Sequence, residues 1–307
     1  MTVRSLDILD LPFLPRYRRN VLPLDSARLL TRGNPLGLTA MLSYLNPRRN
    51  IYTAISTENG NSIMGQVIMK DGDISARLTF IAPLEETDKL LPPLLEALTA
   101  QAGTMGTLYL LAEVDEDSPV FKSLRQAGFA MYAWQRIWKL PYLKGVRGKY
   151  TWRQAEDSDW PAVQSMHAQI VPALIQPVDA LPKQATGLVC RAEGEIQAYV
   201  REESGPEGIW LQPLVPPDST CASEQISGLI RAVSNNDGRM VYVCVRSYLA
   251  WLESSLEDLG AEAGAREAVM VKRLAGMIKE PQPVSVVEKA LAKAKPAAPV
   301  SRIESKE

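Results

Sequence analysis

The sequence predicts a mixed α/β fold that occurs twice in tandem, each copy built on a mixed sheet. Three observations support this prediction. The chain resembles itself at a nearly constant offset, each copy alternates strand and helix patterns in the same order, and the 307 residues are 46% hydrophobic and 22% charged. That composition is close to the average for a soluble protein, and that length is sufficient for two cores of ordinary size.

The internal repeat keeps its register through most of the chain. The segment NSIMGQVIM matches EGEIQAYVRE, ARLTFIAP matches IWLQPLVP, and the opening VRSLDILDLPFL matches TWRQAEDSDWPAV. Such a register indicates two copies of one fold with almost no insertion between matching elements. The residues matched at this nearly constant offset are Ile63 with Ile196, Val67 with Val200, Pro83 with Pro216, Gly106 with Gly238 and Gly128 with Gly260; in the openings they are Arg4 with Arg153 and Asp10 with Asp159.

Each copy predicts the same series of elements. A polar opening strand leads into one or two helices, and turn signals such as TENGN, KDGD, RAEGE and ESGPEG then separate a run of strands. A longer helix follows at 90–102 and at 223–234, where apolar residues at spacings of three and four give one buried face. The next strand, TLYLLAEV or MVYVCV, is apolar on both faces, as expected of a central strand. A short helix ends at Gly128 or Gly260, and a final strand closes the copy.

The final strand of the first copy, AMYAWQRIWKL, carries an aromatic stripe. Tyr132, Trp134 and Trp138 are an even number of residues apart, so the alternation of a strand places them on one face. We expect this face to pack in the core or between the two copies, in preference to stacking on a ligand.

The repeat also sets the expected domain boundaries. Residues 1–143 form the first copy, residues 149–275 form the second, and residues 276–307 form a tail rich in Pro, Ala, Lys and Glu. A segment of that composition buries too little apolar surface to fold alone. The tail is therefore expected to be disordered, with one transient helix near 284–295.

Composition excludes several classes of protein. No apolar run reaches the about eighteen residues that a membrane span needs, and the opening MTVRSLDILD has no apolar signal core, so we expect a cytoplasmic protein. Three cysteines, Cys190, Cys221 and Cys244, follow no zinc spacing and are expected to be free, mostly buried thiols. The single histidine, His167, argues against a Ser-His-Asp triad and a multi-histidine metal site, and is expected to be a packing or helix-surface residue.

Charge is unevenly distributed along the chain. Residues 1–149 hold 18 basic and 14 acidic side chains, a net of +4, whereas residues 150–275 hold 10 and 17, a net of −7. A mildly basic, solvated face is one interpretation; an anionic ligand or partner, or docking of the first copy against the acidic second copy, is the other. Nucleic acid is not expected as a partner, because the basic excess is small and no reader motif occurs.

Four kinds of segment carry a resemblance to a known family. They are IAP followed by a leucine-rich helix, LYLLAEV, SPVFKSLRQAGF with its closing Gly-Phe, and the opening RQAEDSDW. Their order resembles the GNAT-type N-acetyltransferase fold, present twice over most of residues 1–275. The resemblance implies two tandem acyl-CoA N-acyltransferase domains, with acetyl-coenzyme A lying where two parallel strands splay apart. In that family a turn patterned Arg/Gln-x-x-Gly-x-Gly/Ala holds the pyrophosphate through backbone N–H groups at a helix N-terminus.

The turn of the first copy departs from that pattern. Laid on PLEETDKLLPP, the pattern puts Glu86 where Arg or Gln is expected, and Thr87, Lys89 and Leu91 where glycine or a small residue is expected. Like charges at about 7 Å repel by about 1 kcal/mol per pair at an effective dielectric of about 40. Two or three acids would weaken a phosphate ligand by roughly ten- to a hundredfold. The first copy is therefore expected to be structural.

The second copy has smaller residues in the same turn, VPPDSTCASEQ. Ser219 stands where Arg or Gln is expected, and small or hydroxylic residues follow, although Asp218 and Glu224 oppose an anion. Acetyl-coenzyme A is the implied cofactor, and a plain helix N-cap by Ser or Thr is the alternative interpretation of the turn. The candidate cofactor-binding residues are Leu214, Val215, Ser219, Thr220, Ala222 and Ser223.

Candidate catalytic groups are sparse. In the family a tyrosine four residues before the Gly-Phe glycine often protonates the departing thiolate, but Leu124 and Leu256 stand at those positions and cannot transfer a proton. Glu113, with Asp115 close by in LYLLAEVDED, is the candidate general base. A solvated loop at the end of the strand is the alternative interpretation of this acidic group.

Two classes of function follow from the sequence. The first is an N-acyltransferase that moves an acetyl or acyl group from acyl-coenzyme A to an amine of a small molecule or peptide, in the second copy or between the copies. The second is a catalytically inactive pseudo-acetyltransferase that serves as a binding or interaction module, because both phosphate turns and both tyrosine positions depart from the family pattern. In either case the two copies are expected to pack together, no membrane partner is expected, and the oligomeric state is open.

Overall fold

The computed structural model describes most of both repeats. The predicted tail at 276–307, with its helix near 284–295, and the boundary between 143 and 149 lie outside the described residues, so these expectations stay predictions. The described residues are 2–18, 20–37, 50–70, 72–84, 87–141, 150–192, 194–217, 219, 221–233 and 238–274.

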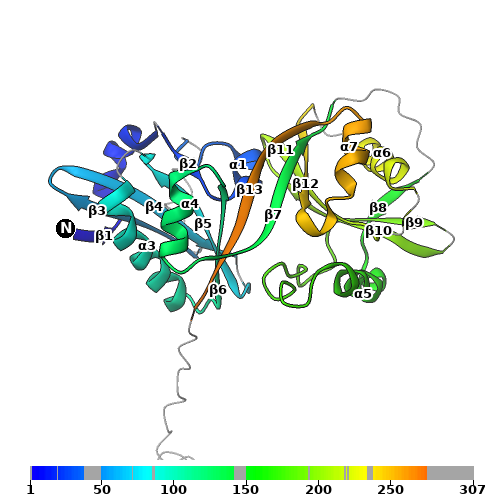
Figure 1. Ribbon diagram of the computed structural model, residues 1–307, viewed down its shortest axis with the longest axis horizontal. Coiled ribbons are helices and arrows are strands. Elements are labelled where there is room, and N and C mark those ends of the chain that lie inside the picture. Colours follow the sequence, from blue (N-terminus) through cyan, green and yellow to red (C-terminus); the bar gives the residue numbers. More distant parts are fainter. Residues whose placement is uncertain are drawn as a thin grey trace, which may run out of the picture. The chain divides into compact units, whose positions relative to one another are not determined.

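One mixed sheet runs through both repeats (Figure 1). Among the described residues it has 13 strands in the order β1-β3-β4-β5-β6-β13-β7-β12-β11-β10-β9-β8, with β2 paired to β5 away from this path. The strands are β1 (Thr2–Ser5), β2 (Leu22–Pro23), β3 (Asn50–Glu58), β4 (Asn61–Met69), β5 (Ser75–Ala82), β6 (Tyr109–Asp115), β7 (Ala130–Lys139), β8 (Trp152–Gln154), β9 (Leu188–Ala192), β10 (Glu195–Ser204), β11 (Gly208–Leu214), β12 (Met240–Arg246) and β13 (Glu262–Arg273).

The two repeats exchange their last strands. β13, at the end of the second repeat, lies between β6 and β7 of the first and pairs antiparallel with both. β7, at the end of the first repeat, lies in turn between β13 and β12 of the second. Figure 1 shows these two long strands side by side between the two halves. Each repeat therefore completes the sheet of the other, and main-chain hydrogen bonds join the two cores.

The openings of the two repeats fold alike, as the repeat predicts. In the first, Arg4 Nη1 lies 2.5 Å from Asp10 Oδ2; in the second, Arg153 Nη1 lies 2.7 Å from Asp159 Oδ2. In each, the aspartate also accepts a main-chain N–H three residues before it, at 2.9 Å. The same bidentate ion pair thus closes the first turn of both copies.

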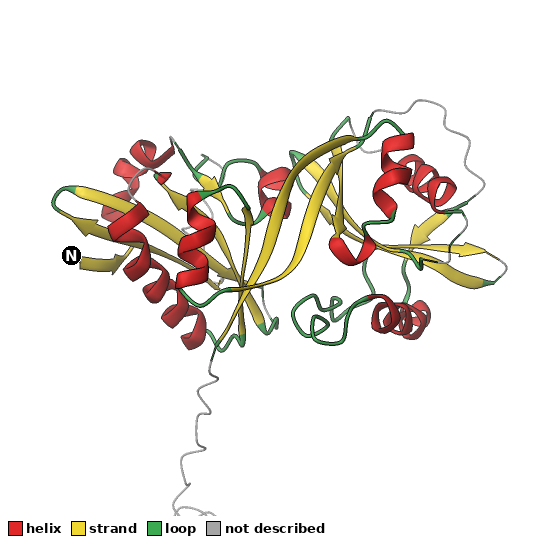
Figure 2. Cartoon of the chain, in the orientation of Figure 1, coloured by secondary structure: helices red, strands yellow, loops and turns green. Residues whose placement is uncertain are grey.

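Helices cover both faces of the sheet (Figures 1 and 2). The long helices predicted at 90–102 and 223–234 are α3 and α6, with bounds that differ by up to three residues from the prediction. The helices are α1 (Ser26–Arg32), α3 (Thr87–Thr104), α4 (Pro119–Gln126), α5 (Trp160–Ile170), α6 (Ala222–Val233) and α7 (Leu252–Asp258), with 3-10 turns η1 (Ile8–Arg18), η3 (Asp157–Asp159) and η4 (Ser247–Leu249).

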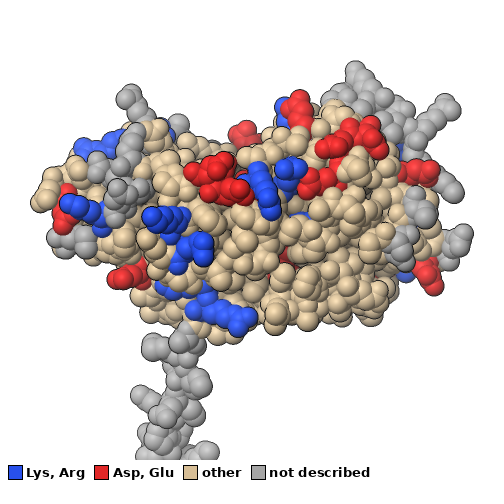
Figure 3. All heavy atoms as spheres, in the orientation of Figure 1, with Lys and Arg blue, Asp and Glu red and all other residues tan. Residues whose placement is uncertain are grey.

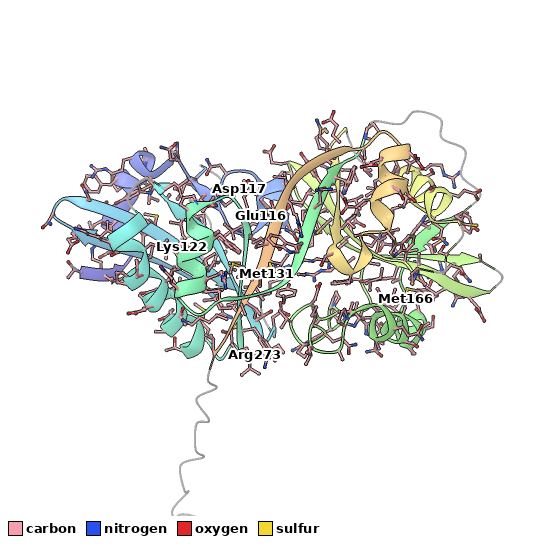
Figure 4. The ribbon with its side chains drawn as sticks, in the orientation of Figure 1. Glu116, Asp117, Lys122, Met131, Met166 and Arg273 are labelled. Carbon is pink, nitrogen blue, oxygen red and sulfur yellow. The ribbon has the colours of Figure 1, made fainter. Side chains whose placement is uncertain are left out.

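Each repeat has its own hydrophobic core. In the first, the predicted leucine face of α3 packs on β3 and β4 so closely that a Cβ added at Gly65 would lie 2.9 Å from Leu98 Cδ1. In the second, Met166 of α5, labelled in Figure 4, belongs to a buried cluster that α5 joins over β10 and β11. Trp138 belongs to the first repeat but is 1% exposed in the second core, because β7 crosses into that half of the sheet. The predicted mixed α/β fold in two tandem copies is confirmed.

The aromatic stripe of β7 does not lie on one face, and in this respect the prediction is wrong. The pairing of β7 with β13 shifts register between Val269 and Met270, which is a β-bulge. Tyr132 therefore packs with Val178 on one side, whereas Trp134 packs in the first core on the other. The stripe nevertheless serves core and interdomain packing, as expected, and ligand stacking is not needed to explain it.

Charged side chains on the face shown in Figure 3 follow the uneven charge of the sequence. Lys and Arg atoms are more frequent over the first repeat and Asp and Glu atoms over the second. Within the described residues, no helix is both long enough and apolar enough to cross a membrane. Among the described residues none of the three cysteines forms a disulfide, and Cys190 and Cys244 are buried.

Candidate functional site

A wedge opens between two parallel strands in each repeat. In the first repeat, the pairing of β5 with β6 ends at Arg77 and Leu111. In the second, the pairing of β11 with β12 ends at Leu211 and Val243. Beyond these points the facing main-chain groups need another partner, which a ligand or another segment can supply.

The first wedge holds a segment of the chain itself. β2 pairs antiparallel with β5 and places Leu22 opposite Ile81. Leu24 then bridges the wedge: its N–H donates to the Thr79 carbonyl at 2.9 Å, and its carbonyl accepts from the Glu113 N–H at 2.8 Å. A short strand thus lies between β5 and β6 with main-chain hydrogen bonds to both.

Buried charge anchors this inserted segment. The Ser26 N–H, at the start of α1, donates to Glu113 Oε2 at 2.9 Å, and Arg77 Nη1 lies 3.1 Å from Glu113 Oε1. Asp25 caps α1 by accepting a main-chain N–H of its first turn at 3.1 Å. Leu24 is 1% exposed and packs in the first core. The segment is therefore held by its side chains and by the helix that follows it, as well as by the strand pairing.

Glu113, the candidate general base, lies in the wall of this filled wedge. Glu113 is 2% exposed, so the alternative interpretation as a solvated loop is wrong for this residue. Figure 4 labels Glu116 and Asp117 in the turn that follows β6. Burial opposes the ionisation of Glu113, but Arg77 and Arg246 outweigh it and hold the pKa of the carboxyl below its usual value. A carboxylate stabilised in this way accepts a proton weakly. Its role as a base stays a prediction.

The second wedge holds no strand of the described residues, and one carboxylate reaches across it. Asp179 comes from the loop between α5 and β9. Gln212 Nε2, on β11, lies 3.3 Å from both Asp179 oxygens, while Tyr248 Oη, just after β12, donates to Oδ2 at 2.6 Å. Arg246 Nε, on β12, lies 3.5 Å from the same oxygen. Within the described part of the chain, side chains therefore link the two strands here, where the first repeat uses main chain.

These contacts keep Asp179 ionised and fix its loop. Burial opposes its charge, but Arg246 and the Tyr248 hydroxyl outweigh burial and hold the pKa of Asp179 below its usual value. His167 Nε2 lies 2.8 Å from the Asp179 carbonyl oxygen, and the histidine is buried on α5. The prediction that His167 is a packing residue is confirmed.

The structure places the candidate cofactor-binding residues around the turn from β11 into α6. Leu214 and Val215 are 5% and 1% exposed and pack in the second core. The Ser219 hydroxyl donates to Gln225 Oε1 at 3.2 Å, and Ala222 is the first residue of α6. The Ser219 side chain thus bonds to Gln225 in the first part of α6, the helix whose N-terminus the resemblance assigns to phosphate binding.

The remaining two candidates are Ser223 and Thr220. The Ser223 carbonyl accepts from Ser227 Oγ at 2.7 Å inside α6, and Thr220 lies outside the described residues. The first turn of a helix offers unpaired N–H groups and a partial positive charge, which suit a phosphate. Glu224 in that turn opposes them. The roles of all six candidates stay predictions.

Three further residues meet where the repeats join, and the sequence reasoning missed them. Arg246, the last residue of β12, lies with its Nη2 3.7 Å from Glu113 Oε1, and no motif marks it in the sequence. Glu267 on β13 accepts from Ser26 Oγ at 2.8 Å, and burial together with the nearby Glu113 charge raises the pKa of Glu267 to about 7. Asp179, the third, lies in a loop whose sequence carries no recognisable signal.

Comparison with known proteins supports the fold alone. No family model matches the sequence, and no curated protein matches it. Among solved structures, a GCN5-related N-acetyltransferase from Sphaerobacter thermophilus superposes with a TM-score of 0.55 at 12% identity, over 89% of this chain and 95% of that one. A putative acetyltransferase from Pyrococcus horikoshii gives 0.50 at 11% identity, over 90% of each chain.

A tandem GNAT protein from the clavulanic acid biosynthesis pathway is also similar. It superposes with a TM-score of 0.50 at 13% identity, over 89% of this chain and 98% of that one. These likenesses confirm the resemblance that the sequence suggested: the chain has the tandem GNAT fold, with two units of that fold in one mixed sheet.

Proposed function

We propose that the chain is an N-acyltransferase that uses acyl-coenzyme A, with acetyl-coenzyme A as the donor, and that the second wedge alone takes the cofactor. The acceptor is an amine of a small molecule or a peptide. The difference between the two wedges carries the proposal. Leu24 occupies the first wedge with hydrogen bonds to both of its strands, whereas no strand of the described residues occupies the second.

The second wedge supplies what a coenzyme A arm requires. The pantetheine arm has two amide groups, and an extended chain with amides can add to a strand by main-chain hydrogen bonds. The inserted segment of the first repeat shows that such an addition fits this fold: β2 pairs with β5 in this way. In the second repeat, residues 212–214 and 244–246 lie beyond the end of the β11–β12 pairing and present the corresponding edges.

The turn into α6 supports the phosphate end. It leads directly into the N-terminus of a 12-residue helix, Ala222–Val233, and the first turn of a helix offers N–H groups and a partial positive charge to an anion. In the first repeat the corresponding turn carries Glu86, and its wedge is filled. Both the turn and the wedge therefore favour the second repeat as the one that binds the cofactor.

The chemistry demands little of side chains. A neutral amine attacks the thioester carbonyl, so the carbon–nitrogen bond forms and the carbon–sulfur bond breaks. The nitrogen loses one proton and the departing thiolate takes up one proton, so the reaction releases no net proton. Orientation of the two reactants supplies most of the rate. Asp179 contacts side chains of both strands of the wedge and accepts a hydrogen bond from the Tyr248 hydroxyl, so the amine would approach beside these two groups.

Calorimetric titration with acetyl-coenzyme A tests the proposal. One molecule should bind per chain, and Ser219→Glu should weaken binding about tenfold, because it adds a negative charge beside the pyrophosphate. Gln169→Glu, which adds the same charge on the exposed surface of α5, is the matched control and should bind like the wild type. Absence of binding, two molecules per chain, or equal affinity of both variants would contradict the proposal.

The alternative function is a pseudo-acetyltransferase that binds a partner without catalysis. The contacts of Asp179 favour this alternative. They link β11 to β12, and they lie in the second wedge, where the cofactor would have to enter. Thiol release from acetyl-coenzyme A in the presence of a panel of primary amines separates the two functions. Release above the rate without amine excludes the alternative, and tight binding without release from any amine supports it.

A further inference from the structure

A second candidate site lies where the repeats join, beside α7. A hollow of about 230 Å³ opens between α7, the end of β12 and the exchanged strands β7 and β13. Its lining includes Arg136 on β7, Arg266 on β13 and Glu253 on α7. None of its lining residues is among the candidate cofactor-binding residues.

Arg136 and Arg266 are direct partners in the antiparallel pairing of β7 and β13. Directly opposed side chains have Cβ atoms about 4.5–5.5 Å apart, and like charges there destabilise a sheet. Over the described register of this ladder, the arginine pair is the one like-charged pair. The other charged positions meet complementary partners: Lys139 Nζ lies 3.4 Å from Glu262 Oε2, and Gln135 Nε2 donates to Glu267 Oε2 at 2.5 Å.

Protein groups neutralise the two arginines only in part. Arg136 Nη1 lies 2.7 Å from Glu253 Oε2, but its buried Nε has no hydrogen-bond partner among the described residues. Arg266 stacks with its guanidinium carbon 4.2 Å from the centre of the Trp134 ring, which leaves the N–H edges of the guanidinium free. No carboxylate in the described part of the chain lies within ion-pair distance of Arg266. The charged groups of the hollow therefore sum to +1.

Two charged residues of the hollow, Glu253 and Arg266, have no charged counterpart in the first repeat. In the register of the repeat, Glu253 corresponds to Phe121 and Arg266 corresponds to Trp134. Phe121 and Trp134 stack on each other with ring centroids 6.5 Å apart, so the corresponding place in the first repeat is apolar. At these two positions the second repeat is therefore charged where the first repeat is apolar.

We infer that this hollow binds a small oxyanion, a carboxylate or phosphate group, that bridges Arg136 and Arg266. Guanidinium groups bind such groups through paired N–H bonds, and an anion between them removes the repulsion that the ladder otherwise carries. Glu253 competes with the anion for Arg136 and so limits its affinity. The inference does not depend on the proposed acyltransferase activity, because the site needs neither coenzyme A nor the second wedge.

Titration of the full chain with sodium phosphate and, separately, with sodium propionate tests this inference, at constant ionic strength set with chloride and without coenzyme A. The two salts distinguish a phosphate from a carboxylate site. One anion should bind per chain, and Arg266→Gln should weaken it at least tenfold, since half of the bridge is lost. Glu253→Gln should tighten it about three- to tenfold, because the competing carboxylate is removed.

Arg125→Gln, which removes one exposed positive charge from α4, is the control and should bind the anion like the wild type. Tighter binding by Glu253→Gln is the diagnostic result, because a variant that unfolds cannot produce it. The inference is wrong if neither salt binds at millimolar concentrations, if Arg266→Gln and Arg125→Gln lose the same affinity, or if Glu253→Gln binds no more tightly than the wild type.

Discussion

Glu113 of the first repeat and Arg246 of the second form a buried ion pair, with Arg246 Nη2 3.7 Å from Glu113 Oε1. Both side chains are 2% exposed. The pair joins β6 to β12 and thus links the two repeats.

Three other contacts between the repeats join residues at matching positions, as contacts near the two-fold axis of a symmetric dimer do. Each joins residues at the offset of the repeat, and each joins unlike partners, so the favourable contacts exist only because the two copies differ. The contacts are Lys70 with Glu203 at 3.0 Å, Gln135 with Glu267 at 2.5 Å, and Arg266 over Trp134 at 4.2 Å.

Replacing the central arginine should be costly. Arg246→Gln removes the cation that lies beside both Glu113 and Asp179, and leaves these buried carboxylates without it. Breaking a buried ion pair by removing one partner costs about 3–5 kcal/mol. Urea unfolding should show a loss of that size, whereas Arg125→Gln on exposed α4 should change stability by less than about 0.5 kcal/mol. A loss below about 1 kcal/mol for Arg246→Gln would show that the network does not hold the repeats together.

Glu267 should make stability depend on pH near neutrality. Its pKa is raised from 4.5 to about 7, first by burial and then by the charge of Glu113. Between these values the folded state binds more protons than the unfolded state, so the contribution of Glu267 is fully present below pH 4.5 and is lost as the pH rises through 7. The loss amounts to roughly 2–3 kcal/mol.

Glu267→Gln removes this titration and keeps an oxygen that can accept from Ser26 and Gln135. Compared with the wild type, the variant should therefore gain stability as the pH rises from about 5 to 8. Glu262→Gln on the same strand, at an exposed position, is the control. Parallel stability curves for the wild type and Glu267→Gln across that range would contradict the assignment.

The inserted strand of the first wedge should contribute to stability through its buried leucine. Leu24→Ala removes a side chain that is 1% exposed and should cost about 2–4 kcal/mol in chemical unfolding. Leu9→Ala, at a residue that is 79% exposed, is the matched control and should cost less than about 0.5 kcal/mol. Equal, small costs for both variants would indicate that the segment leaves the wedge readily.

Glu113→Gln separates a structural role from a catalytic one. If Glu113 only anchors the filled wedge, the variant should lose about 1–3 kcal/mol of stability, because a charged partner of Arg77 becomes neutral, while turnover per folded molecule changes less than about threefold. If Glu113 is the general base, kcat should fall about a hundredfold or more with unchanged acetyl-coenzyme A affinity. Kinetics and unfolding of the same preparation decide between these outcomes.

Periodicity and the repeat were sufficient to predict the fold. The spacing of the leucines of α3 and the doubly apolar pattern of the central strands depend on local sequence, and the matched offsets establish that these elements occur twice. The exchange of β7 and β13 was not predictable in this way, because a strand has the same pattern whichever neighbour it pairs with. The site was predicted less well for the same reason.

Only contacts between distant segments define the two wedges. Leu24 fills the first wedge from a segment whose sequence looks like an ordinary loop, and Asp179 reaches the second from another loop. Neither residue stands in a motif. The prediction that Tyr132 and Trp134 share one face failed because a single β-bulge places Tyr132 on the opposite face of the sheet.

Hydrogen exchange with and without acetyl-coenzyme A tests the central claim most directly, because it reports on both wedges in one experiment. We expect slower exchange on binding for peptides that cover 212–219 and 222–226, with no change for 20–24 and 79–82, which are already bonded to each other. Protection at 20–24 and 79–82, or none at 212–219 when acetyl-coenzyme A binds, would contradict that claim.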